Sequence, residues 1–132
     1  MDYTTENAEG EKLGCYIMGY DMTNGDTGLT VAAGDRYAQP DVVLAAPNKM
    51  QGVVVKDGAV TLSQSYGRKN NACLLRYALA LDEAPDTALT VMPMTEALAD
   101  APDGGIYVLF ESGATHYANG TYRTDHVWKI KF

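Results

Sequence analysis

Short apolar runs separated by turn-forming residues are the feature that most constrains the fold of this chain. From Leu13 onward, segments rich in Val, Ile and Tyr alternate at close intervals with Gly, Asn, Asp and Pro. This punctuation is typical of antiparallel β-structure, in which β-branched and aromatic residues fill the strands and turn residues separate them. The sequence therefore predicts an all-β protein.

The expected strands follow one another along most of the chain. They are LGCYIMGY (13–20), GLTVAA (28–33), VVLAA (42–46), QGVVVK (51–56), AVTLSQSY (59–66), NACLLRYALALDE (71–83), TALTVMPM (87–94), GIYVLFES (105–112), ATHYANGTYRT (114–124) and HVWKIKF (126–132). Segment 71–83 is rich in the helix formers Ala and Leu, but its alternation places Cys73, Leu75 and Tyr77 on one face, so we expect a strand. Pro93 is expected to place the end of its strand at an edge or exit.

Helix is expected in one place only, the segment TEALADAP (95–102), capped by Thr95 and stopped before Pro102. Asp57-Gly58 predicts a two-residue hairpin turn, because its central residues need positive φ. A series of strands with little helix indicates a sandwich or a barrel. The uneven loop lengths favour an antiparallel β-sandwich with Greek-key or jelly-roll-like connections.

The length of 132 residues fits one domain. Residues 1–12 are polar, acid-rich and aperiodic, which predicts an N-terminal arm that stays mobile or is ordered by a partner, in front of a single domain over 13–132. No window approaches the roughly twenty apolar residues of a membrane span, and the first residues do not resemble a secretory signal. We expect no membrane partner and no export.

The net charge of −7 argues against a nucleic-acid partner, because such affinity comes largely from cations that displace counterions. Two cysteines, Cys15 and Cys73, have no metal-like spacing and lie inside apolar runs. We expect two reduced core thiols; a disulfide is the alternative in an oxidising compartment, since sequence does not show their separation.

The stretch DMTNGDTGLT (21–30) allows two interpretations. Asp21, Asn24 and Asp26 offer oxygen ligands for an irregular calcium site. A hand-type loop from Asn24 fails, however, because Leu29 stands where the sharp turn needs Gly and Asp35 stands where the loop needs Glu. Asn24-Gly25 between two apolar runs is a hairpin signal, and we favour the turn.

The histidines His116 and His126 are the natural acid–base groups of this chain. Cys15 or Ser112 with His116 and Asp125 has the composition of a catalytic triad, and both histidines with Asp125 have that of a metal site. No nucleophile elbow surrounds either candidate nucleophile. We therefore expect neither an enzyme nor a cofactor, and a small His-dependent hydrolase or metal enzyme stays as the third hypothesis.

Acidic side chains could supply the carboxylate pair of a glycosidase from the set Asp82, Glu83, Asp86 and Glu111. A run of acids is more commonly a solvated face, and this one falls largely in expected turns. Asn119-Gly120-Thr121 has the form of a glycosylation acceptor, but a hairpin turn explains the same residues.

Aromatic residues gather in the last third of the chain, and Tyr117, Tyr122 and Trp128 offer large contact areas with a polar tip. Core packing is the expected role for most of the aromatics. An exposed set would stack on sugar rings, so a carbohydrate-binding β-sandwich is the second hypothesis.

A compact β-domain behind an acidic N-terminal extension resembles, in general style, the accessory proteins of bacteriophage particles, especially capsid decoration proteins. The resemblance implies an oligomeric domain on the outside of a capsid lattice, where contacts with coat protein stabilise the shell. We expect a non-enzymatic interaction protein located in a virion, or in the cytoplasm if it is not viral. The candidate interaction residues are Tyr3, Thr4, Thr5, Glu6, Tyr117, Tyr122 and Trp128.

Overall fold

The computed structural model describes residues 14–22, 29, 31–81 and 83–132. These residues contain nine strands and two single 3-10 turns. The elements are β1 (Cys15–Gly19), β2 (Val42–Ala46), β3 (Met50–Lys56), β4 (Ala59–Gln64), β5 (Ala72–Ala78), β6 (Thr87–Val91), β7 (Thr95–Asp100), β8 (Ile106–Phe110), η1 (Glu111–Gly113), η2 (Thr115–Tyr117) and β9 (Trp128–Ile130). No helix in this part of the chain is long and apolar enough to span a bilayer.

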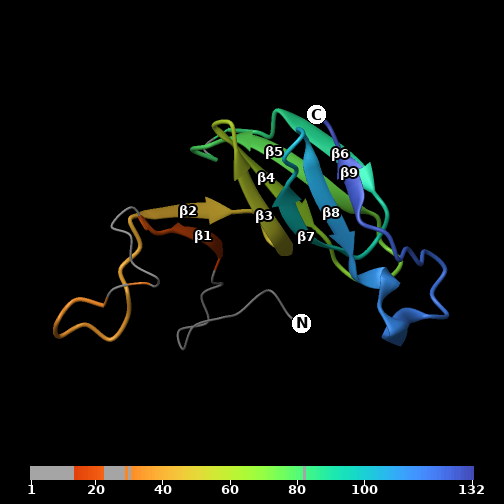
Figure 1. The fold of residues 1–132 in the computed structure, drawn as a ribbon, viewed down its shortest axis with the longest axis horizontal. Coiled ribbons are helices and arrows are strands. Elements are labelled where there is room, and N and C mark those ends of the chain that lie inside the picture. Colours follow the sequence, from red (N-terminus) through yellow and green to blue (C-terminus); the bar gives the residue numbers. More distant parts are fainter. Residues whose placement is uncertain (1–13, 23–28, 30, 82) are drawn as a thin grey trace.

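The strands form three antiparallel sheets. Strands β3-β4-β5-β6 make one layer, β7-β8-β9 make a second layer that packs against it, and β1-β2 form a separate two-stranded ribbon (Figure 1). The all-β, sandwich-like prediction is confirmed. Hydrogen-bonded neighbours are consecutive in sequence throughout the described sheets, so these are meanders without the Greek-key or jelly-roll crossing that the loop lengths suggested.

The central strands β4 and β5 are buried on both faces. On one face, Val60 and Leu62 of β4 lie opposite Tyr77 and Leu75 of β5 and form a cluster with them. On the other face, Leu74 packs against the second layer, in a cluster completed by Ile106, Val108 and Phe110 of β8. The alternation expected for 71–83 is present over β5, with apolar residues on both sides, but the strand ends at Ala78, and Leu81 lies beyond it with a φ of 56°.

Strands β3 and β7 approach very closely where the two layers meet. A Cβ at Gly52 would lie 2.4 Å from the Glu96 carbonyl oxygen, so only glycine permits this approach. Ser63 Oγ donates a hydrogen bond to the same carbonyl oxygen at 2.6 Å. Lys56 forms an ion pair with Asp100 at the far end of β7.

The helix expected over 95–102 is wrong, because Thr95–Asp100 is strand β7. Glu, Ala and Leu favour helix, but so short a helix gains little on its own, whereas this segment pairs with β8 and lies against β3. A β-bulge between Thr95 and Leu98 lets both side chains face the core across one extra residue. The bulge breaks the strict alternation by which the strand would otherwise be recognised.

Two of the expected strands are also wrong. Segment 114–124 contains η2 and turns, since Gly113 packs against the Thr124 carbonyl oxygen and the Gly120 N–H donates to the Tyr117 carbonyl oxygen at 2.8 Å. In segment 28–33, Leu29 and residues 31–33 lie outside any strand; the Asp35 N–H closes a turn onto the Ala32 carbonyl oxygen. Neither stretch has a partner strand among the described residues. Alternation of residue types alone therefore did not produce a hydrogen-bonded strand.

The Asp57-Gly58 turn is confirmed, whereas the hairpin turn expected at Asn119-Gly120 is wrong, because no strands flank it among the described residues. Asp57 and Gly58 have φ of 50° and 72°, which gives the two-residue hairpin between β3 and β4. Strand β6 ends at Val91, two residues before Pro93. The Asn24-Gly25 hairpin and the N-terminal arm over 1–12 both lie outside the described residues.

Replacing Gly52 with Ala tests the close approach of β3 and β7. The new methyl group would overlap the Glu96 carbonyl oxygen, and we expect a loss of about 1–3 kcal/mol in the free energy of unfolding, measured in urea. Gly14→Ala is the matched control, since its Cβ would make only ordinary contacts and should cost within about 0.5 kcal/mol. Equal stability of the two variants would contradict the close approach of β3 and β7 at Gly52.

Candidate interaction surface

The β1–β2 ribbon is apolar on both faces. Its register pairs Tyr16 with Ala45 and Met18 with Val43, and these four side chains form one face, here called the outer face. The opposite, inner face carries Cys15, Ile17, Val42, Leu44 and Ala46. The ten residues of the two strands, CYIMG and VVLAA, include no charged side chain.

The outer face is exposed to solvent. Tyr16, Met18 and Val43 are 56 %, 55 % and 53 % exposed. An antiparallel ribbon with one face on a core normally turns polar side chains to the water, so an apolar outer face is unusual. No third strand pairs with either edge of this ribbon in the described residues, which leaves a two-stranded sheet of marginal stability on its own.

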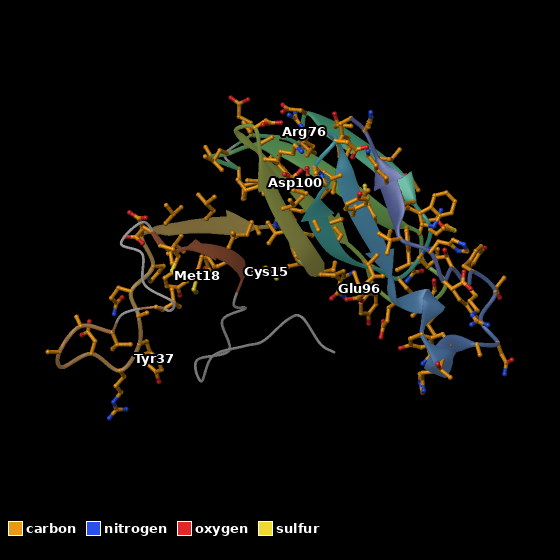
Figure 2. The ribbon with its side chains drawn as sticks, viewed as in Figure 1. Cys15, Met18, Tyr37, Arg76, Glu96 and Asp100 are labelled. Atoms are coloured by element: carbon orange, nitrogen blue, oxygen red, sulfur yellow. The ribbon has the colours of Figure 1, made fainter. Side chains whose placement is uncertain are left out.

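The inner face holds the ribbon to the body of the molecule. Ile17 and Ala46 pack against the cluster on the outward side of the four-stranded sheet. The base of the long connection is closed by the Asp41 N–H, which donates to the Gly19 carbonyl oxygen at 2.9 Å, and by the Asp21 N–H, which donates to Asp41 Oδ2 at 2.6 Å. Figure 2 shows Met18 and Tyr37 on this projecting part, away from the sandwich.

The interaction residues expected from the sequence are only partly described. Tyr3, Thr4, Thr5 and Glu6 lie outside the described residues. Trp128 is half exposed, and its indole N–H donates to Thr124 Oγ1 at 3.0 Å.

The other two expected interaction residues, Tyr117 and Tyr122, line one cavity whose lining does not include Trp128. The structure thus brings the two tyrosines together without the tryptophan. The sequence did not predict the ribbon as an interaction surface, because its exposed residues are of types that usually lie in a core.

The histidines lie in separate places. His116 lines the cavity of Tyr117 and Tyr122, whereas His126 lines another cavity and lies 2.5 Å from Asp125, between Nδ1 and Oδ1. Asp125 therefore pairs with His126 instead of orienting His116. No group of three His, Cys, Asp or Glu side chains that would hold a metal ion occurs in the described part of the chain.

The two candidate nucleophiles lie in different places relative to these histidines. Cys15 lies at the ribbon, far from the 3-10 turns that carry His116 (Figure 2). Ser112 lines the same cavity as His116, whereas Asp125 lines a different one. Ser112 is buried, and its hydroxyl oxygen accepts a hydrogen bond from the Thr124 N–H at 3.3 Å.

Both cysteines are free thiols, and burial raises the pKa of Cys73. Of the expected calcium ligands, Asn24 and Asp26 lie outside the described residues. Of the carboxylates considered for a glycosidase pair, Asp82 also lies outside the described residues. Asp86 forms an ion pair with Arg76.

A carboxyl pair that the sequence did not indicate occurs at the β7 bulge. Glu96 and Glu111 both line a cavity of about 490 Å³. Burial and then the negative charge of Glu111 raise the pKa of Glu96. Tyr117 Oη donates a hydrogen bond to Glu111 Oε1 at 3.1 Å.

The predicted helix hid this pair, because it placed Glu96 on an exposed helical turn. Reading TEALAD as a strand next to GIYVLFES would have brought Glu96 near the residues that follow Phe110.

Glu96→Gln tests the raised pKa of Glu96. Because the pKa of Glu96 is raised, its contribution to stability is full below the ordinary glutamate range and is lost as pH rises through the raised value. The variant cannot ionise, so we expect it to gain stability relative to wild type between about pH 4 and about pH 7. The gain should stay below about 1 kcal/mol because solvent partly screens the site.

Urea unfolding at both pH values measures this gain. Glu83→Gln, at an exposed carboxylate, is the control and should not show it. A pH dependence of Glu96→Gln identical to that of wild type would contradict the raised pKa of Glu96.

Comparisons with known proteins found no match: no protein-family model, no curated protein and no solved structure is similar to this chain. Function is therefore inferred from the residues of the chain itself.

Proposed function

We propose that this protein is a non-enzymatic structural protein that associates with copies of itself through the β1–β2 ribbon and docks on a larger protein shell. The observation that carries the proposal is the outer face of the ribbon, which is apolar, free of charge and more than half exposed at Tyr16, Met18 and Val43. Contiguous exposed apolar surface of this kind marks sites of protein contact.

The charge distribution favours the ribbon as the place where two copies meet. Each chain carries a net charge of −7, so close approach of two copies is opposed by repulsion over most of the surface. The ribbon strands contain no Asp, Glu, Lys, Arg or His. Contact there removes apolar area from water without burying a charge.

The outer face alone is too small for a stable interface. Specific interfaces involve about 20–30 residues a side, whereas the outer face offers Tyr16, Met18, Val43 and Ala45. We propose that residues 2–12, including Tyr3, Thr4, Thr5 and Glu6, supply the rest by pairing with a sheet edge of a neighbouring copy. Such pairing gains main-chain hydrogen bonds at the cost of ordering the segment, and repeated contacts in an assembly offset that cost.

The shell in this proposal is the coat-protein lattice of a virus particle, which is what the resemblance to capsid decoration proteins implies. A lattice offers identical docking positions in fixed geometry, so contacts that are weak singly become strong together. A coat or portal gene next to the gene for this chain would support the viral assignment.

The other two hypotheses have less support. A sugar-stacking platform needs coplanar exposed rings, but Trp128 is absent from the cavity lined by Tyr117 and Tyr122. A hydrolase built on both histidines needs them at one site, but they line different cavities. A glycan-array signal that is lost in Trp128→Ala would reverse the order of the first two hypotheses.

Val43→Asp and deletion of residues 2–12 test self-association. A carboxylate at the centre of the outer face would have to be buried in the interface, which is strongly unfavourable without a partner. We expect both variants to shift from the oligomeric mass of wild type toward the monomer in size-exclusion chromatography with light scattering.

Val127→Asp is the matched control, because it places the same charge at an exposed valine outside the ribbon. It should keep the wild-type mass. A wild-type protein that is monomeric at all concentrations up to about 1 mM, the range that includes weak complexes, would contradict the proposal. So would a wild-type oligomer whose mass is unchanged both in Val43→Asp and in the arm deletion.

A further inference from the structure

The cavity between the loop after β4 and the two 3-10 turns combines basic side chains with aromatic walls. Its volume is about 250 Å³, and its lining includes Arg68 and Lys69 from the loop and His116, Tyr117 and Tyr122 from the segment around η2. None of the residues that line it is acidic. The net charge of the chain is −7, whereas the lining of this cavity carries two cations and no carboxylate. The cavity is therefore locally positive in a molecule that is negative overall.

The cations at this cavity are not used by ion pairs. Each ion pair found among the described residues joins other side chains, on Lys56, Arg76, His126 and Lys129. Arg68 instead lies over the ring of Tyr117, with its guanidinium carbon 4.6 Å from the ring centroid. A stacked guanidinium keeps its N–H donors in the plane of the group, where they can bind an oxyanion.

The walls of the cavity are held in place by specific contacts. Tyr117 is fixed at its hydroxyl, which donates to Glu111 Oε1, and at its backbone N–H, which donates to the Ala114 carbonyl oxygen at 2.9 Å. On the other side, Gly67 has a φ of 77° and Asn70 Nδ2 donates to the Tyr66 carbonyl oxygen at 2.9 Å, which shapes the loop that carries Arg68. A preformed site of this kind loses little entropy on binding.

We propose that this cavity binds a compact oxyanion, a phosphate or a carboxylate group, through Arg68 and Lys69. Guanidinium groups bind both anions through paired N–H donors, and Lys69 adds a second positive charge. The cavity is smaller than the roughly 300–1,000 Å³ of sites for drug-sized ligands, which restricts the ligand to a small molecule or a single charged group. Tyr122 and Asn119, which also line the cavity, offer a ring face and an amide to whatever carries the anion.

Two sources of the anion are distinguished by titration of the full chain in a low-chloride buffer, followed by amide NMR. Inorganic phosphate tests a free phosphate, D-glucuronate tests an acidic sugar, and D-glucose is the uncharged control. We expect saturable shifts confined to amides of the loop 65–71 and the segment 112–122 with phosphate, glucuronate or both, and none with glucose. Binding of one anion alone identifies the source, and binding of both assigns the site to the shared oxyanion group.

Arg68→Gln and Lys69→Gln are the test variants. Each removes a charge-assisted hydrogen bond, so we expect binding to weaken by about tenfold or more in each. Arg36→Gln is the matched control, since it makes the same change of charge on the long connection between β1 and β2, and it should bind as wild type does. Absence of saturation with both anions, glucose shifts as large as those of glucuronate, or equal affinity in Arg68→Gln and Arg36→Gln would overturn the proposal.

Discussion

Burial of β4 and β5 on both faces is the constraint on which the rest of the structure depends. One face is covered by the second sheet, where Leu74 packs against β8, and the other is partly covered by residues from the ribbon, including Ile17 and Ala46. Ile17 and Ala46 of the inner face thus pack against the core, and strand alternation then turns Met18 and its neighbours outward. The exposed apolar face follows from a ribbon that is apolar throughout but has a covering layer on only one side.

Much of the fold could be predicted from the sequence because alternation and turn residues act locally. Asp57-Gly58 set the β3–β4 hairpin, and the two-faced pattern around Leu74 and Leu75 identified β5. The errors came from tertiary contacts that no local pattern records. Segment 95–100 is a strand because β8 and β3 pair and pack with it, and 114–124 is irregular because Gly113 brings the chain back against Thr124.

The candidate sites were harder to predict, because each depends on which residues are left exposed or brought together. Tyr16, Met18 and Val43 have the residue types of a core, and only their solvent exposure identifies a surface. Glu96 and Glu111 are fifteen positions apart and meet through the β7–β8 pairing. Arg68 and Tyr117 meet across an even longer separation, so the basic cavity has no signature in the linear sequence.

Hydrogen–deuterium exchange measured at low and high protein concentration tests the central claim most directly. If the ribbon is where copies meet, amides of residues 15–19 and 42–46 exchange more slowly as concentration rises, because association protects backbone groups that are otherwise open to water. Amides of β4 and β5 should exchange at the same slow rate throughout. Ribbon exchange that is fast and independent of concentration would contradict the account.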